Sequence, residues 1–280
     1  MRNTQHPETK QNSRRGFFHS LGAATAVLTA AAQSKVHAQS GLYQFQFDSP
    51  TQILTAALIA EDLATTFYYN SLVGKAADDP VFQNDPGDKN YLRAALSEEI
   101  AHANLLRSLL NIPAAANDPV QTFYFPKGTF DTLNPESGAG VVPTLEALEN
   151  AFIGAYLTAV RAFSFMAANT AMGRGVYYKL GNSNLSPDQL AYFSQVAASI
   201  LGVEAEHRAL VRVIGSKEPA NNVCYQQTAG LDSVFSGPKS AVVALTPFLT
   251  PTTGPAYSFK EALDGSAAIA LPCEFGPPAP

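Results

Sequence analysis

Two of the five histidines in this 280-residue chain end the same four-residue motif, Glu-x-x-His. The two motifs are Glu99-Ile-Ala-His102 and Glu204-Ala-Glu-His207. Residues three apart on a helix lie on one face, so each motif places a carboxylate beside an imidazole. Two such motifs, with one glutamate from each of two further helices, form the di-iron or di-manganese site of a four-helix bundle. The pair of motifs therefore predicts four helices that meet around one site.

Four long segments have the apolar periodicity of helices that face a bundle core, and each follows a helix start signal. The segments follow Asp48-Ser49-Pro50, start near Asp88, follow Val142-Pro143-Thr144, and follow Leu185-Ser186-Pro187-Asp188. The second ends before Pro113 and the fourth ends at Gly215. The connections between them are short, long and short, as in a bundle with one long crossover. The sequence therefore predicts an all-α fold of this type.

The inward-facing stripes of the four segments carry six candidate metal ligands. They are Glu61, Glu99, His102, Glu149, Glu204 and His207. Four buried carboxylates would repel one another unless cations neutralised them, and the stripes contain no lysine or arginine. Two divalent ions balance four carboxylates, and ligands of oxygen and nitrogen without thiolate suit iron or manganese better than structural zinc. We therefore predict two Fe or Mn ions as cofactors.

Neighbouring residues leave alternatives to this assignment. Glu146 lies one turn before Glu149 on nearly the same face and is a reserve candidate for the third-helix ligand. Tyr156 lies two turns after Glu149 and is either an aromatic core residue or a residue with a role beside the metals. A metal-free polar core is a further alternative, but each glutamate would then have to be protonated or paired with a cation. Three acidic residues next to the stripes are not expected to be ligands: Glu98 and Glu206 should face solvent or a neighbouring helix, and Asp62 should point elsewhere.

The first 38 residues have the features of an export signal. Ser13-Arg14-Arg15-Gly16-Phe17-Phe18 fits the twin-arginine pattern, and Val36-His37-Ala38 is a small-x-small cleavage site. The apolar stretch between them is short and rich in alanine, which favours cleavage over a membrane anchor. We expect the twin-arginine machinery to export the chain to the periplasm or out of the cell.

After this cleavage the chain keeps 13 of its 18 basic and 22 of its 23 acidic residues, for a formal net charge of −9. This charge argues against binding to nucleic acid and to anionic membranes, because both are polyanions. No later apolar run is long enough to cross a bilayer, so we expect no stable membrane span after cleavage.

Composition divides the chain into three segments. These are a signal peptide over 1–38, the bundle over 39–216 and an irregular, proline- and glycine-rich extension over 217–280. The extension holds both cysteines, Cys224 and Cys273, and an oxidising compartment favours a disulfide between them over two free thiols.

Three short runs lie outside the four predicted helices. Gln121-Thr-Phe-Tyr-Phe125, in the long crossover, either adds a short strand or simply covers the bundle. In the extension, Ala241-Val-Val-Ala-Leu245 is a candidate strand and Phe259 to Leu263 a candidate helical turn.

The run Leu148-Glu149-Asn-Ala-Phe-Ile-Gly154-Ala155-Tyr156 and the paired Glu-x-x-His motifs resemble the ferritin-like superfamily. The likeness is greatest to exported ferritin-like domain proteins grouped with desiccation-related proteins, and it covers about Phe47 to Ser216. It implies a ferritin-like four-helix bundle whose di-metal centre has ferroxidase, peroxidase or catalase-like activity toward a small oxidant, O2 or peroxide. It implies nearly as well a non-enzymatic stress or desiccation-related protein whose metal is structural or absent.

Three features depart from cage ferritins and related electron-transfer proteins. The chain has an export signal, has no rubredoxin-like cysteine module, and has a long C-terminal extension. An extension folded back on the bundle would hide surface that a closed shell requires. We therefore expect a monomer or small homo-oligomer.

Overall fold

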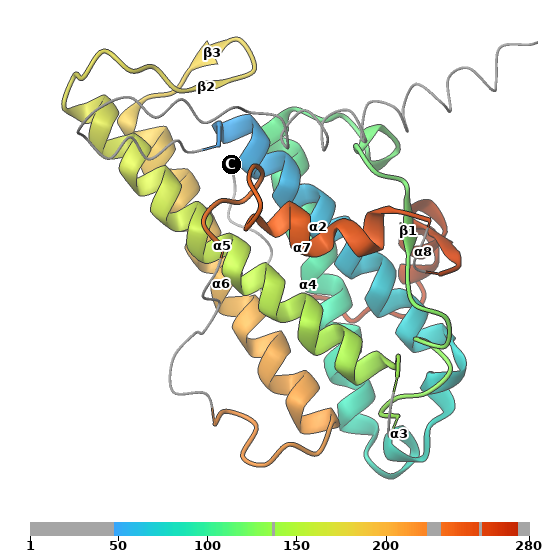
Figure 1. The fold of residues 1–280 in the computed structure, drawn as a ribbon. Helices are drawn as coiled ribbons and strands as arrows, with labels where there is room; N and C mark the ends of the chain where they lie inside the picture. The colour runs from blue at the N-terminus through green and yellow to red at the C-terminus, as the bar shows by residue number, and fades with distance from the viewer. Residues whose placement is uncertain (1–47, 136–137, 223–230, 252–253, 274–280) are drawn as a thin grey trace, which may run out of the picture.

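The computed structural model describes residues 48–135, 138–222, 231–251 and 254–273, and four long helices dominate it (Figure 1). They are α2 (Pro50–Val73), α4 (Pro86–Leu110), α5 (Val141–Ala171) and α6 (Pro187–Ile214). α2 packs mainly on α4, and α5 packs mainly on α6. The predicted all-α bundle with its long second connection is confirmed, whereas the predicted signal peptide lies outside the described residues.

Capping residues near the start of α2 and of α6 define where these helices begin. Ser49 and Ser186 each form a capping box with the glutamine three residues later, and each precedes a proline at the first helical position. α5 begins at Val141, two residues before its proline, without a side-chain cap. Instead, the first N–H groups of α5 donate to the carbonyls of Thr132 and Leu133 in the crossover.

Two clusters of buried apolar residues fill the bundle above and below its middle. On α4 one cluster includes Leu96 and the other begins at Ala103, and on α6 they are separated between Leu201 and Val211. Both Glu-x-x-His motifs fall in these intervals. The apolar clusters therefore enclose the acidic layer from both ends of the bundle.

The connections carry short elements that cover the bundle. The first holds η1 (Lys75–Asp78) and α3 (Pro80–Asn84), and the third holds the small hairpin of β2 (Lys179–Leu180) and β3 (Ser183–Asn184).

The long crossover holds η2 (Ala115–Asn117) and β1 (Thr122–Tyr124), and β1 pairs antiparallel with β4 (Ala256–Ser258) of the extension. The run Gln121–Phe125 thus both adds a strand and covers the core, since Phe123 and Phe125 are fully buried.

The C-terminal extension is more regular than its composition predicts. The run 241–245, predicted as a strand, belongs instead to helix α7 (Ala241–Leu249), which lies across α2 and α5 (Figure 1). Ser240 caps this helix by accepting a hydrogen bond from the N–H of Val243. A short apolar run has no periodicity that separates strand from helix, which explains the error.

The predicted helical turn from Phe259 is confirmed as the start of α8 (Phe259–Ser266), which packs on α2. Cys224 lies outside the described residues, so the predicted disulfide with Cys273 does too.

Among the described helices, α5 is long and apolar enough to cross a membrane by length and composition. The expectation that no later apolar run reaches this length was therefore wrong. α5 nevertheless packs along α6 and contributes a large share of the buried core. Core helices of soluble bundles meet the same criterion, because they are apolar for the same reason.

Candidate metal centre

All six predicted ligands lie together at the middle of the bundle. α2 provides Glu61, α5 provides Glu149, and α4 and α6 each provide one Glu-x-x-His pair. Five of the six side chains are buried, and only His102 keeps 12% of its side chain exposed. The site is therefore almost closed to water, with its one partly open side at His102.

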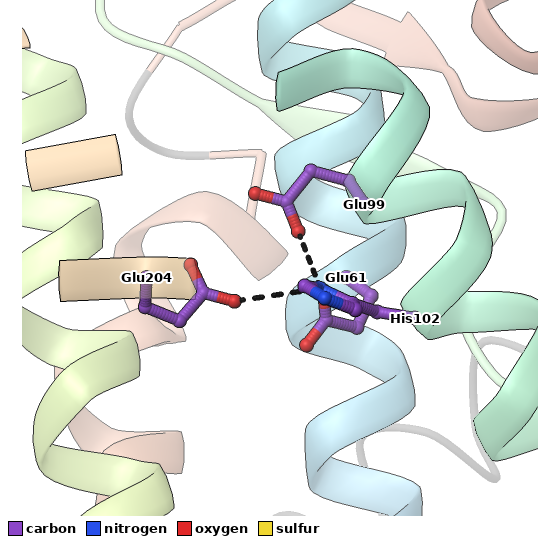
Figure 2. A group of neighbouring side chains, drawn as sticks. All are labelled: Glu61, Glu99, His102 and Glu204. Carbon is purple, nitrogen blue, oxygen red and sulfur yellow. Dashed lines mark hydrogen bonds and ion pairs between the residues drawn. The ribbon is translucent and has the colours of Figure 1, made fainter. Parts of the chain in front are cut away.

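The ligand atoms form two groups that share two carboxylates. The first group is Glu61, Glu99, His102 and Glu204 (Figure 2), and the second is Glu99, Glu149, Glu204 and His207. Within each group the ligand atoms lie within 4.8 Å of one another.

Each shared carboxylate directs one oxygen to each histidine. Glu99 Oε2 lies 3.6 Å from Nδ1 of His102, and Glu99 Oε1 lies 3.1 Å from Nδ1 of His207. Glu204 Oε1 lies 3.7 Å from Nδ1 of His102, and Glu204 Oε2 lies 3.5 Å from Nδ1 of His207. Glu99 and Glu204 could therefore contribute an oxygen to each of two metal ions.

The residues fit a pair of cations because their polar atoms are otherwise unsatisfied. Both oxygens of Glu99 and Glu204, Oε2 of Glu149 and Nδ1 of His207 are buried without a hydrogen-bond partner among the described residues. Some of these atoms are within ion-pair distance of one another, but not in hydrogen-bond geometry. Buried polar atoms in proteins are almost always paired, so this cluster of exceptions points to bound cations.

The electrostatics of the site favour protons when no metal is present. Burial raises the pKa of Glu99 and of Glu149, and neighbouring carboxylates raise both further. Burial alone would lower the pKa of His102 and of His207, but the surrounding carboxylates outweigh it and raise both well above the usual value. Metal binding must therefore release protons from the cluster.

Two tyrosines bind the carboxylates that are not shared. Tyr68 lies seven residues after Glu61 on α2, and Tyr156 lies seven residues after Glu149 on α5. Each hydroxyl crosses to the other helix: Tyr68 donates to Glu149 Oε1 at 2.6 Å, and Tyr156 donates to Glu61 Oε1. Of the two roles open for Tyr156 from the sequence, the structure gives it both, a buried ring and a contact to a candidate ligand.

Glu98 holds the second histidine from outside the cluster. Its Oε2 lies 2.8 Å from Nε2 of His207, and this hydrogen bond lowers the pKa of Glu98. When the His207 ring is neutral, an ionised Glu98 favours its proton on Nε2, and Nδ1 then faces Glu99 and Glu204 as the ligand atom. The sequence placed Glu98 toward solvent or a neighbouring helix and gave it no role, because helix spacing does not show which helix lies opposite.

The other acidic residues near the stripes point away from the cluster. Glu146 pairs with Nη1 of Arg212 at 2.8 Å, so it does not join the candidate centre. Asp62 is buried and pairs with Nη2 of Arg107 at 2.7 Å. Of the two third-helix candidates, the structure thus brings only Glu149 to the other ligands.

The comparison with protein families covers most of this site. Residues 49–174 match the family model of the ferritin-like domain. The matched stretch of the ferritin-like domain includes α2, α4 and α5, and with them Glu61, the first Glu-x-x-His motif and Glu149. α6 and the second motif follow the match, and the structure adds them to the bundle.

The comparisons with curated proteins and with solved structures gave no match. The family match, the fold and the carboxylate–histidine cluster together support a ferritin-like protein with the residues for metal binding.

Proposed function

We propose that this chain is an exported ferritin-like protein that binds two iron or manganese ions and uses them in redox chemistry with a small oxidant, O2 or peroxide. The observation that carries the proposal is the sharing of Glu99 and Glu204 between two four-residue groups. Two bound metal ions would supply electrons through changes in their oxidation states.

The chain's own residues would hold and orient that pair. Glu99 and Glu204 belong to both groups and would help to hold both ions, while Glu61 and Glu149 each belong to one group and would help to hold one ion. The tyrosine hydroxyls fix one oxygen of each unshared carboxylate and leave the other oxygen for a ligand role. The apolar clusters on both sides exclude water, which strengthens every electrostatic interaction within the site.

We further propose export through the twin-arginine route and function in the periplasm or outside the cell as a monomer or small oligomer. That route carries folded proteins, so the centre can be filled before export. Copper and zinc bind such ligands more tightly than iron or manganese do, and filling in the cytoplasm would keep these two metals out of the site. Packing of α7 and α8 on the bundle supports a small assembly, because they cover helix surface that a closed shell would use.

Metal analysis tests the proposed centre. The purified chain, loaded with Fe(II) or Mn(II) without oxygen, should hold close to two ions, and Glu99→Gln should lose both because both groups use Glu99. Glu146→Gln is a matched control on the helix that carries Glu149, and it should keep both ions because Glu146 pairs with Arg212.

A wild-type chain with fewer than about 0.2 ions under every loading condition would contradict the proposal. Two bound ions with no consumption of O2 or peroxide would favour the non-enzymatic alternative, in which the metal is structural.

A further inference from the structure

An apolar cavity lies between α2, α5 and α7, beside the candidate centre. It leaves about 20 Å³ for the centres of water-sized molecules, which is room for roughly one small molecule. Its inner walls include Ala57 and Ala60 of α2 and Ala155 and Ala159 of α5. Because these side chains are short, α2 and α5 leave a space that larger residues would fill.

The C-terminal extension forms one wall of the cavity. Val242 and Leu245 of α7 line it with apolar side chains. The N–H of Val242 donates to the carbonyl of Val234, and the N–H of Ala241 donates to Ser233. These two N–H groups therefore already have hydrogen-bond partners, and the first turn of α7 presents apolar side chains to the cavity.

Tyr156 joins the cavity to the candidate centre. Its side chain lines the cavity, and its hydroxyl donates to Oε1 of Glu61. It is the one polar side chain among the described residues that line this space, and its hydroxyl is directed to the carboxylate. A molecule in the cavity would thus be separated from a candidate ligand by a single side chain.

We infer that this cavity binds dioxygen and delivers it to the centre, an inference that rests on the proposed function. A space lined by apolar groups stays dry and accepts small apolar molecules. Hydrogen peroxide would lose its hydrogen bonds to water there, and the hydroxyl of Tyr156, the one polar side chain among the described lining residues, already donates to Glu61. Metal ions and peroxide require a polar approach, which the partly exposed His102 provides outside the lining of this cavity.

Xenon under pressure tests the cavity independently of any metal. Crystals of the full chain should show xenon between α2, α5 and α7 in both the metal-free and the metal-loaded protein. Val242→Phe should fill the cavity and abolish the xenon peak. Val243→Phe is the matched control, because Val243 is the next residue of α7, is half exposed and does not line the cavity. Absence of xenon from the wild-type cavity would overturn the inference whatever the metal content.

Oxidation kinetics test the delivery of dioxygen. Loaded with Fe(II), Val242→Phe should react with dioxygen several-fold more slowly than Val243→Phe, while the two react equally with peroxide. Ala57→Leu fills the cavity from the opposite wall and should reproduce the effect, which guards against a local folding defect in α7.

If the variants that fill the cavity and the control Val243→Phe bind as much metal as the wild type and react with dioxygen at equal rates, the inference is overturned. That result would leave the proposed function intact. A wild-type centre that binds no metal would remove both the proposed function and the delivery of dioxygen to it, even if xenon binds.

Discussion

The two halves of the candidate centre carry the same residue types in different surroundings. Each half has a histidine, an unshared glutamate and a tyrosine that reaches across from another helix. His207 is buried, and Glu98 holds its Nε2 at 2.8 Å. His102 keeps 12% of its side chain exposed, and its hydrogen bond to Glu61 Oε2 at 3.3 Å uses Nδ1, the nitrogen that faces the cluster. Repetition in sequence thus sets the ligand types, while the neighbouring helices set how firmly each ligand is held.

This difference has a consequence for metal affinity. A histidine whose second nitrogen is fixed has a defined tautomer and orientation, and its ligand nitrogen is more basic. We therefore expect the His207 half to bind its ion more tightly and the His102 half to exchange its ion more readily.

Removal of both histidines should have the largest effect. The double variant His102→Ala with His207→Ala should lose metal binding altogether, because each half loses its one nitrogen ligand. Of the single variants, His207→Ala should weaken binding of the first ion more than His102→Ala does. Calorimetric titration of each variant with Mn(II) measures this. A double variant with wild-type affinity would refute the ligand assignment, and equal single effects would break the expected difference between the halves.

The stability of the metal-free protein should decrease as pH rises. The pKa values of Glu99, Glu149, His102 and His207 are raised in the folded state, so the folded chain binds more protons than the unfolded chain. The resulting stabilisation is complete below the unfolded values and is lost as pH rises through the folded ones. Metal affinity should show the opposite trend, because binding releases those protons.

Denaturant unfolding between about pH 5 and 9 checks this prediction with and without metal. Metal-free stability that is constant or increases with pH would contradict the raised pKa values.

Loss of Glu98 should have an intermediate effect confined to one half. Glu98→Ala should lower the affinity for one of the two ions by about 10–100-fold, since residues that hold a metal-binding histidine have effects of this size. The second ion should bind as in the wild type, as should both ions in the control Glu146→Gln. A uniform loss at both sites would mean that Glu98 does not act through His207.

The tyrosines should show the smallest effects, and nearly equal ones. Tyr68→Phe and Tyr156→Phe each leave one carboxylate oxygen without its donor, which should cost the metal-free protein about 1–3 kcal/mol of unfolding free energy. Thermal and denaturant unfolding measure both. A large difference between the two variants would show that the halves differ in this feature as well.

The features that the sequence predicts correctly depend on signals from residues close together in the chain. The helix starts at Ser49 and Ser186 depend on capping residues within three positions, so they can be located without knowing the fold. The six candidate ligands fall on apolar stripes whose inward direction follows from helical periodicity alone.

The remaining features depend on contacts between distant segments. Glu98 meets His207 only because α4 and α6 are neighbours at that level of the bundle. Asp48 accepts hydrogen bonds from the N–H groups of Val234, Phe235 and Ser236, a contact that holds the extension and has no local sequence signal. The alanine-lined cavity likewise exists only once α7 has been placed over α2 and α5.

Anomalous diffraction from crystals loaded with Fe(II) or Mn(II) is the most direct test of the two-metal centre. We expect two metal peaks, one beside His102 and one beside His207, with Glu99 and Glu204 contacting both. Partial loading should fill the His207 position first. Crystals of the loaded chain with no metal at the candidate centre, or with one ion that contacts neither Glu99 nor Glu204, would contradict the two-metal assignment.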